Sequence, residues 1–360
     1  MKRRLRPILR RLDQPALITG GAGFIGTNLA ARLLDEGRRV RIFDNLSRVG
    51  VDANAHWLKA AYGDRLEIVI GDIRDRTAVA RAVTDAGEVY HFAAQVAVTS
   101  SLDDPHHDFS VNAGGTLNLL EALRALPSPP PMIFTSTNKV YGDLEDIELV
   151  PEDRRYVPAD TTIRACGVSE RRNIDFHSPY GCSKGAADQY VLDYARTFGI
   201  PAVVFRMSCI YGPHQCGNED QGWVAHFVRC ALEGKPVTIY GDGHQVRDVL
   251  YVDDLLAAFN LAHAQMASLA GEAFNIGGGP RRAVSLLDLI GAIDALGAPP
   301  LDVSYDAWRE ADQRYYVTDT AKFHEATGWT PAVGVAEGLQ GLHGWLAGES
   351  PVRERLTAAS

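Results

Sequence analysis

Short apolar runs rich in β-forming residues alternate with longer amphipathic stretches along the first half of the chain. This alternation predicts an α/β fold, with a doubly wound parallel sheet and helices on both of its faces. The runs that predict strands are residues 16–19, 39–43, 66–70, 88–92, 131–135 and 202–205. The stretches with helical periodicity include residues 28–36, 77–84 and 112–126.

The pattern becomes shorter and more mixed after residue 205, which predicts a smaller C-terminal α/β domain. Its predicted elements are helices at 222–232, 253–264 and 333–346, strands at 237–240 and 272–275, and a helix capped by Ser285. The stretch 142–177 has no clear periodicity and is longer than a normal connection. We expect it to be either a lid or an excursion beside the active site.

The composition is that of an ordinary globular protein, with 46% hydrophobic and 22% charged residues in a chain of 360. A net charge of −9 argues against a general nucleic-acid binder, which needs a basic face. No run is long enough to span a membrane, and the basic start of the chain lacks the apolar segment of a secretion signal. We therefore expect a cytoplasmic protein with no nucleic-acid or membrane partner.

The five cysteines are scattered along the chain and lack the spacing of zinc ligands. An odd, scattered set predicts a reducing compartment, no disulfide framework and no metal site. Cys182 lies inside a helical stretch, where we expect a small buried side chain.

The first predicted strand runs into a glycine-rich turn, Thr19-Gly20-Gly21-Ala22-Gly23-Phe24-Ile25-Gly26, which opens a helix. The spaced glycines allow a tight turn, close approach of the backbone to a pyrophosphate, and close packing of helix on strand. Free N–H groups at the helix start face the phosphates. This context predicts a Rossmann dinucleotide site with contacts at Gly20, Gly23, Phe24, Ile25 and Gly26.

Asp44 ends the second predicted strand, eighteen residues after the last glycine of the turn. A carboxylate there binds the adenosine ribose hydroxyls and repels a 2′-phosphate, so NAD is favoured over NADP as the cofactor. Asn45 adjoins it as a further cofactor contact, whereas the nearby Arg48 leaves NADP open. Asp72 and Ile73 follow the third strand as candidate adenine contacts. The alternative is that Asp72 only caps the next helix.

The stretch 175–190 carries a candidate catalytic pair. Ser178 and Pro179 indicate a helix start, with Ser178 as the N-cap. Tyr180 and Lys184 are then four residues apart and emerge on one face of that helix. A tyrosine has a pKa of about 10, which a neighbouring ammonium and the helix N-terminus would both lower, so that Tyr180 can act as a base. The alternative is a chance pair on an ordinary helix.

The fifth predicted strand ends in a cluster of hydroxyl residues, Thr135-Ser136-Thr137, where doubly wound sheets bind their ligands. A hydroxyl there would face Tyr180 and hydrogen-bond the substrate oxygen, although Thr/Ser clusters at strand ends also serve ordinary turns.

From about residue 15 to 345 the chain resembles the extended short-chain dehydrogenases/reductases that act on nucleotide sugars. The motifs that carry the resemblance are the glycine turn, His91-Phe92-Ala93-Ala94-Gln95, Asn112-x-x-x-Thr116-x-Asn118, Val140-Tyr141-Gly142 and Tyr180-x-x-x-Lys184. It implies that the catalytic residues are Thr137, which binds substrate, Tyr180, which is the acid/base, and Lys184, which binds the nicotinamide ribose. It also implies a homodimer or homotetramer. The further cofactor contacts are Ala93, Gln95 and Asn112.

Three stretches, 136–143, 175–190 and 220–224, resemble the branch of this family that epimerises C2 of a CDP-sugar. Dehydratases of the family carry an Asp-Glu pair where this chain has Asn138-Lys139, and an amide and an ammonium do not replace that acid and base. The resemblance implies an NAD-dependent epimerase that removes hydride to give a 2-ketone and returns it to the opposite face. The alternatives are 4- or 2-epimerisation of a UDP-, GDP- or ADP-sugar, or a catalytically silent NAD-binding regulator.

The resemblance also implies residues on the substrate side. Many members use an asparagine on the sugar diphosphate where this chain has Cys209, a departure shared with the C2-epimerising branch. Arg247 and Arg309 match positions of phosphate-binding arginines, whose alternative role is in surface salt bridges. The predicted substrate contacts are Thr137, Asn138, Lys139, Cys209, Gln221, Trp223, Arg247 and Arg309.

These assignments divide the chain into two domains and two tails. The NAD-binding Rossmann domain consists of residues 14–205, and residues 246–264 return to it. The nucleotide-sugar-binding domain consists of residues 206–245 and 265–350. Residues 1–13 form a basic tail and 351–360 a C-terminal tail. The basic tail is expected to be a frayed end, or the product of a start codon placed too early, rather than a binding arm.

Overall fold

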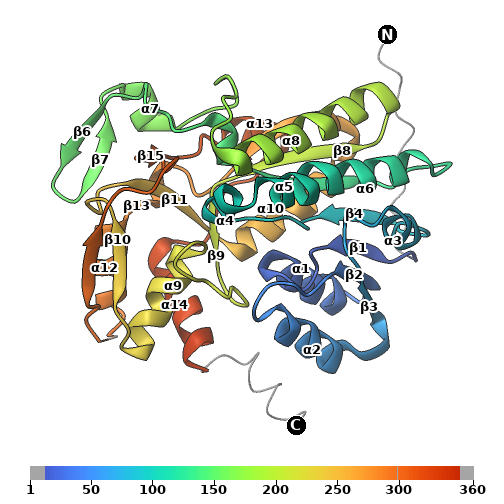
Figure 1. The fold of residues 1–360 in the computed structure, drawn as a ribbon, viewed down its shortest axis with the longest axis horizontal. Coiled ribbons are helices and arrows are strands. Elements are labelled where there is room, and N and C mark those ends of the chain that lie inside the picture. The colour runs from blue at the N-terminus through green and yellow to red at the C-terminus, as the bar shows by residue number, and fades with distance from the viewer. Residues whose placement is uncertain (1–12, 298, 349–360) are drawn as a thin grey trace.

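The computed structural model describes residues 13–297 and 299–348. The predicted tail 351–360 and the predicted basic tail, apart from Asp13, lie outside the described residues. The described chain forms a large α/β part with a smaller group of strands and helices at one side (Figure 1).

A seven-stranded sheet forms the centre of the larger part, and all neighbouring strands in it are parallel. In order across the sheet the strands are β12 (Ala273–Ile276), β8 (Ala202–Met207), β5 (Met132–Thr137), β4 (Glu88–His91), β1 (Ala16–Thr19), β2 (Val40–Asp44) and β3 (Leu66–Ile70). The strand order reverses direction at β1, as in doubly wound folds. The predicted parallel sheet is confirmed.

Helices cover both faces of the sheet, because neighbouring residues of each strand point to opposite sides. Ile18 and Leu17, for example, belong to different cores. One face carries α1 (Phe24–Asp35), α2 (Val51–Tyr62), α10 (Val252–Ala264) and α11 (Met266–Leu269), and the other carries α3 (Arg76–Ala82), α6 (Gly115–Arg124) and α8 (Ser178–Phe198). The short α4 (Val98–Asp103) and α5 (Pro105–Phe109) lead through a π-helical turn, η2 (Ser110–Gly114), into α6.

Two segments after residue 264 belong to the larger part, although the sequence assigned them to the smaller domain. β12 pairs with β8 of the main sheet, although the sequence placed residues 265–350 in the smaller domain. A second return is made by α13 (Ala321–Thr327), whose Phe323 packs edge-on against Phe274. A boundary at residue 264 is therefore too early, because the buried apolar strand β12 completes the edge of the sheet.

The smaller part has its own strands and its own core. β11 (Val246–Tyr251) pairs with β9 (Cys209–Tyr211), β13 (Ala283–Ser285) and β15 (Tyr315–Tyr316), and β10 (Val237–Tyr240) pairs with β14 (Val303–Asp306). Its core includes one face of each of the helices α9 (Trp223–Glu233), α12 (Leu286–Asp294) and α14 (Val335–Ala347). Ser285 caps α12 through a capping box with Asp288, so this prediction is confirmed.

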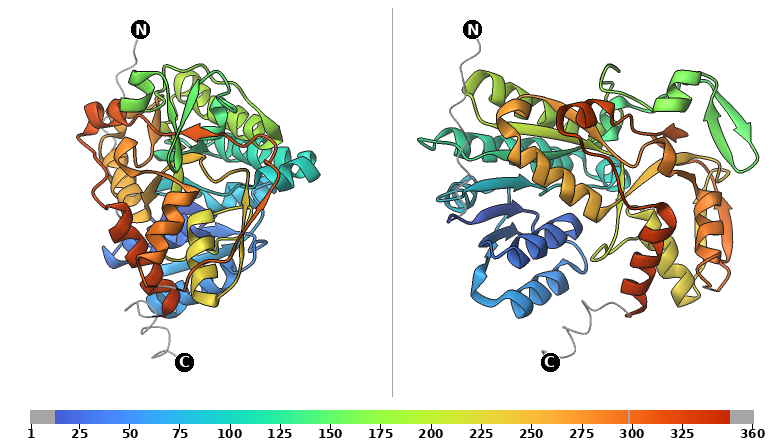
Figure 2. Two further views of the ribbon diagram at one scale, coloured as in Figure 1. Left: turned by 90° about the vertical axis from the view of Figure 1, so that its left-hand side faces the viewer. Right: turned by 180° about the vertical axis from the view of Figure 1, so that it is seen from behind.

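The long stretch 142–177 forms an arm that projects along the smaller part (Figure 2). Its elements are the hairpin of β6 (Leu149–Glu152) and β7 (Arg155–Pro158) and the helix α7 (Thr161–Cys166). The N–H of Tyr156 donates to the carbonyl of His244 at 2.9 Å, and Arg155 pairs with Asp288. The arm is therefore bonded to the smaller part through its hairpin. Three 3₁₀ turns complete the fold: η1 (Gly63–Arg65), η3 (Asn138–Tyr141) and η4 (Pro280–Arg282).

None of the helices within 13–297 and 299–348 is both long and apolar enough to cross a membrane. All five cysteines are free, and among the residues described no three acidic, histidine or cysteine side chains gather to hold a metal ion. Cys182 is exposed, so the prediction of a buried side chain is wrong. It lies two residues from both Tyr180 and Lys184, which places it on the opposite, outer side of α8.

Candidate active site

A cavity of about 890 Å³ opens at the carboxyl ends of the main strands, between them and the smaller part. All predicted site residues except Asn112 line it: Gly20, Gly23, Phe24, Ile25, Gly26, Asp44, Asn45, Asp72, Ile73, Ala93, Gln95, Thr137, Asn138, Lys139, Tyr180, Lys184, Cys209, Gln221, Trp223, Arg247 and Arg309. No residue of 142–177 belongs to the described lining. In this structure the arm therefore does not cover the cavity.

The glycine turn lies against the end of β4 in backbone contact. Gly20 has a φ of 69°, and a Cβ there would lie 2.7 Å from the backbone nitrogen of Ala93. A Cβ at Gly26 would collide with the carbonyl oxygen of Gly20. Gly23 is the N-cap of α1 and supplies no side-chain cap, so the N–H groups of the first helical turn face the cavity. This cradle fits the pyrophosphate of a dinucleotide.

Asp44 is tied to the glycine turn from the end of β2. Its Oδ2 accepts from the N–H of Ala22 at 3.1 Å and its Oδ1 from the N–H of Leu46 at 2.9 Å. Burial raises the pKa of the Asp44 carboxyl, while these N–H donors and the charge of Arg48 act to lower it. Each oxygen keeps lone-pair capacity, so the carboxylate fits a pair of ribose hydroxyls.

Asp72 also lines the cavity, but its carboxylate is engaged by Arg74. The guanidinium donates to both carboxylate oxygens, at 2.9 and 2.7 Å. This hydrogen bonding holds the pKa of Asp72 well below its usual range. The alternative prediction, that Asp72 caps the next helix, is wrong, because α3 is capped by Asp75 through the N–H groups of Thr77 and Ala78.

The helix α8 brings Tyr180 to the cavity in its first turn. The helix begins at Ser178, one residue earlier than predicted, with His177 in the N-cap position. Ser178 still performs the capping, because its Oγ accepts from the N–H of Gly181 at 3.2 Å. The N–H of Tyr180 donates to Oγ of Ser101 at 3.2 Å. Ser101 lies on α4, and no sequence pattern marks it.

The environment of Tyr180 differs from the one expected. Its hydroxyl hydrogen-bonds the side chain of Thr137, whereas the sequence predicted only that a hydroxyl at this strand end would face Tyr180 and bind the substrate oxygen. Burial raises the pKa of Tyr180 to about 12, whereas the Thr137 hydrogen bond and the charge of Arg48 lower it. The expectation that Lys184 lowers this pKa is not met, because the Lys184 ammonium instead donates to the carbonyl of Thr135 at 2.7 Å. Tyr180 therefore holds its proton in this structure.

Lys184 is almost completely buried, with 4% of its surface exposed. Burial lowers the pKa of Lys184 to about 8, although the charges of Asp188 and Asp108 raise it. Its Nζ also lies 4.4 Å from the centre of the Phe134 ring. An ammonium has three donors, so the group retains N–H groups for ribose hydroxyls after bonding to the strand.

Asn112 lies behind the cavity wall and not in it. Its Oδ1 accepts from the N–H of Gln95 at 2.9 Å, and its Nδ2 donates to Asp108 and Ser183 at 3.1 and 3.0 Å. The structure thus differs from the predicted direct contact with the cofactor. Asn112 acts one layer back, because it fixes the backbone of Gln95, which lines the cavity.

The Asn138-Lys139 pair is bonded to a segment of the smaller part. Asn138 donates from Nδ2 to Oε1 of Gln313 at 3.1 Å. The Lys139 ammonium donates to the carbonyl of Ala311 at 2.9 Å and lies 3.6 Å from the Asp312 carboxylate. Burial lowers the pKa of Lys139, while the charge of Asp312 raises it. The pair therefore ties the end of β5 to the smaller part, and no sequence pattern indicated this partner segment.

The two predicted phosphate-binding arginines have different settings. Arg247 is 8% exposed and donates to Asp312 at 2.8 Å, so the alternative of a surface salt bridge is wrong for it. Arg309 is more open: it lies 3.4 Å from Asp220 and stacks 3.9 Å above the centre of the Tyr240 ring. Both guanidinium groups line the cavity on the side of the smaller part.

Cys209, Trp223 and Gln221 lie on the same side of the cavity. The Nε1–H of Trp223 donates to Sγ of Cys209 at 3.5 Å, and burial raises the pKa of the thiol. Gln221 accepts from the guanidinium of Arg48 at 2.7 Å. This last bond links the loop after β2 to the loop before α9, and both loops line the cavity.

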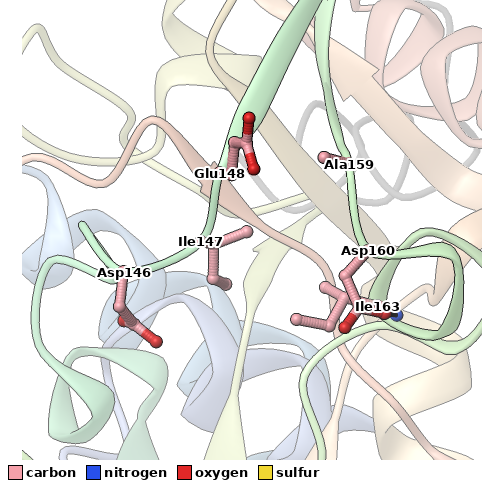
Figure 3. Close-up of a pocket in the computed structure, with 6 residues that line it drawn as sticks. All are labelled: Asp146, Ile147, Glu148, Ala159, Asp160 and Ile163. Atoms are coloured by element: carbon pink, nitrogen blue, oxygen red, sulfur yellow. Dashed lines mark hydrogen bonds between the residues drawn. The ribbon is translucent and has the colours of Figure 1, made fainter.

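A second pocket of about 470 Å³ lies on the arm (Figure 3). Its Asp160 caps α7 by accepting from the N–H of Thr162 at 2.7 Å. Its Asp146 pairs with Arg172. Because these carboxylates serve local structure, the larger cavity is the candidate active site.

Known proteins resemble this chain over nearly its whole length. The family described as "NAD dependent epimerase/dehydratase family" matches residues 16–277. A CDP-paratose 2-epimerase of Salmonella typhi is 45% identical over 92% of this chain and 98% of that protein. The UDP-glucuronic acid 4-epimerase of Bacillus cereus, solved with UDP-glucuronic acid and NAD, is 27% identical over 93% of this chain and 100% of that one, with a TM-score of 0.79. The UDP-glucose 4-epimerase of Thermus thermophilus, solved with NAD, is 32% identical over the same shares, with a TM-score of 0.76.

Proposed function

The chain belongs to the NAD dependent epimerase/dehydratase family, and on this premise we propose that it inverts C2 of the sugar in a CDP-sugar, a reaction of the CDP-paratose to CDP-tyvelose type. It is an NAD-dependent nucleotide-sugar epimerase. The observation that carries the finer assignment is the 45% identity to the CDP-paratose 2-epimerase over 92% of the chain. The Asn138-Lys139 pair supports it, because this pair lacks the acid and base that a dehydratase needs.

The chemistry that bound NAD supplies is removal and return of a hydride at C2. Tyr180 takes the proton of the C2 hydroxyl and later returns it to the ketone oxygen, while Thr137 holds that oxygen by a hydrogen bond. Because the pKa of Tyr180 lies near 12 in this structure, proton removal at neutral pH depends on groups that stabilise the phenolate. The Thr137 hydroxyl and the Arg48 charge act in that direction.

The remaining residues of the site bind and orient. The glycine turn would hold the cofactor pyrophosphate, Asp44 its adenosine ribose and Lys184 its nicotinamide ribose. Arg247 and Arg309 would hold the diphosphate of the sugar nucleotide. Their opposite places in the cavity support this division, since the glycine turn lies on the larger part and the arginines on the smaller one.

We further propose a cytoplasmic homodimer or homotetramer without a nucleic-acid or membrane partner. A net charge of −9 supports the exclusion of nucleic acid. Light scattering on the purified full chain measures the oligomeric state, and a monomer would contradict this part of the proposal.

A panel of CDP-, UDP-, GDP- and ADP-sugars tests the function, with the configuration of each product determined by NMR. We expect turnover of a CDP-sugar with inversion at C2 and, in D₂O, no deuterium on that carbon. Carbon-bound deuterium would indicate enolisation in place of hydride transfer. Inversion at C4, or turnover of UDP-sugars alone, would establish the alternative epimerase, and NAD binding without any turnover would favour a silent regulator.

A further inference from the structure

Thr137 has one hydroxyl proton and two neighbours that can accept it. Its Oγ1 donates to Oδ1 of Asn138 at 3.3 Å, and the same side chain hydrogen-bonds the hydroxyl of Tyr180. The backbone N–H of Lys139 donates to Oγ1 of Thr137 at 3.2 Å. Hydrogen bonds from hydroxyl donors are usually about 2.7–2.8 Å long. The bond from Thr137 to Asn138 is longer, at 3.3 Å, and is therefore weak. A proton given to Asn138 is withheld from Tyr180.

The amide of Asn138 is held in one orientation by Gln313. Asn138 Nδ2 donates to Gln313 Oε1 at 3.1 Å, which leaves Asn138 Oδ1 toward Thr137. Gln313 is fully buried at 0% exposure, and its Nε2 donates to the carbonyl of Gly142 at 2.6 Å. Its backbone carbonyl accepts from Arg247. Turning either amide over would leave buried polar atoms unpaired, which is costly in a protein interior.

We propose that Asn138 and Gln313 are a positioning pair that sets the direction of the Thr137 hydroxyl proton. While Tyr180 is protonated, Thr137 gives its proton to Asn138 and accepts the hydrogen bond of the phenol. When Tyr180 ionises, Thr137 turns its proton from Asn138 to the phenolate. The pair acts through Thr137. The inference rests on the proposed function, in which Tyr180 is the acid/base.

Substitutions of Asn138 should move the ionisation of Tyr180 in opposite directions. Asn138→Ala removes the competing acceptor, so Thr137 donates to Tyr180 permanently and favours the phenolate. Asn138→Asp is nearly isosteric and keeps an acceptor, but its negative charge disfavours the phenolate. We expect the acidic limb of kcat/KM to move about one pH unit down in the first variant and about one unit up in the second.

Gln313→Leu tests the second member of the pair. It releases the Asn138 amide, so the acidic limb should move down as in Asn138→Ala, and the double variant should add little to either single change. We expect the changes to appear mainly in kcat, with KM changed less than about threefold. A purely structural role would lower activity without moving the pH limb.

Two readouts separate this proposal from the proposed function. One is the pH profile with the nucleotide sugar that the wild type turns over best. The other needs no substrate: phenolate absorbance is titrated in each variant with and without Tyr180→Phe, and the difference isolates Tyr180 among 13 tyrosines. NAD content and thermal melting show that each protein is folded. If Asn138→Ala does not fold, an upward shift in Asn138→Asp supports the pair, and a downward or absent shift overturns it.

Opposite shifts in the two Asn138 variants would support the positioning pair. Shifts of the same sign, or no shift, would overturn it even where turnover falls. An unchanged profile in Gln313→Leu would remove Gln313 from the pair. If the wild type turned over no nucleotide sugar, the proposed function would fail, and the phenolate titration would still decide the role of the pair.

Discussion

The Lys184 ammonium donates to the carbonyl oxygen of Thr135 at 2.7 Å and thereby fastens α8 to the end of β5. Tyr180 lies one turn earlier on the same helix, and Thr137 lies two residues further along the same strand. This bond therefore sets the spacing between the two elements that carry Tyr180 and Thr137. The charges of Asp188 and Asp108 favour the protonated form of this buried ammonium.

Lys184 should make stability depend on pH in the alkaline range. Burial lowers the pKa of Lys184 from 10.5 to about 8, so between these values the unfolded chain binds more protons than the folded one. Stability then rises with pH across that window. Relative to Lys184→Met, the unfolding free energy of the wild type should rise by up to about 3 kcal/mol from pH 8 to 10.5.

Urea unfolding followed by circular dichroism measures this difference at a series of pH values. Lys235→Met is a suitable control, because the Lys235 side chain is 67% exposed and should give no such trend. A difference that stays flat between wild type and Lys184→Met would contradict the assigned burial of the charge.

Tyr180→Phe should abolish most of the activity while preserving the cofactor site. The change removes only the hydroxyl, so NAD content should stay normal while turnover falls about 10²- to 10⁴-fold, the usual contribution of a general acid/base. Tyr190→Phe on the same helix, where the side chain is 45% exposed, should remain fully active. Near-normal turnover in Tyr180→Phe would remove Tyr180 from its role.

Gly20→Ala should weaken NAD binding at least about tenfold, because the new Cβ would displace the turn that approaches the pyrophosphate. The control is Gly37→Ala: Gly37 has a φ of 81°, similar to the 69° of Gly20, but a Cβ there meets nothing within 4 Å. Both variants thus carry backbone strain, and only Gly20→Ala adds a clash. NAD released on denaturation of the purified proteins gives the comparison; equal NAD content would argue against the cradle.

Asp188 and Arg206 should contribute strongly to the folding of the site. Arg206 donates to both carboxylate oxygens of Asp188, at 2.9 and 3.0 Å. The side chain of Arg206 is 7% exposed and that of Asp188 is 1% exposed. Arg206→Met leaves a buried carboxylate without its partner, which should cost about 3–5 kcal/mol of unfolding free energy. Arg124→Met breaks an exposed pair with Glu121 and should cost less than about 1 kcal/mol. Equal losses in chemical denaturation would refute the distinction.

Site residues that belong to local patterns could be found in the sequence. The glycine turn, Asp44 and the Tyr180–Lys184 pair each combine a short spacing with a predicted strand or helix, and such spacings place side chains on one face or at one strand end. Ser101 and Gln313 could not be found this way. Their bonds to Tyr180 and Asn138 span 79 and 175 positions, and an isolated serine or glutamine carries no periodic signal.

Periodicity, spacing and motif resemblance predicted the strands of the main sheet, the glycine turn and the proposed catalytic residues Thr137, Tyr180 and Lys184, because these signals act within one element or between neighbours. The ionisation of Tyr180 and Lys184 depends instead on tertiary packing. The pKa of Tyr180 rises to about 12 and that of Lys184 falls to about 8 because burial removes water from both. The partner of the Lys184 ammonium is likewise a carbonyl 49 positions away, which no local pattern specifies.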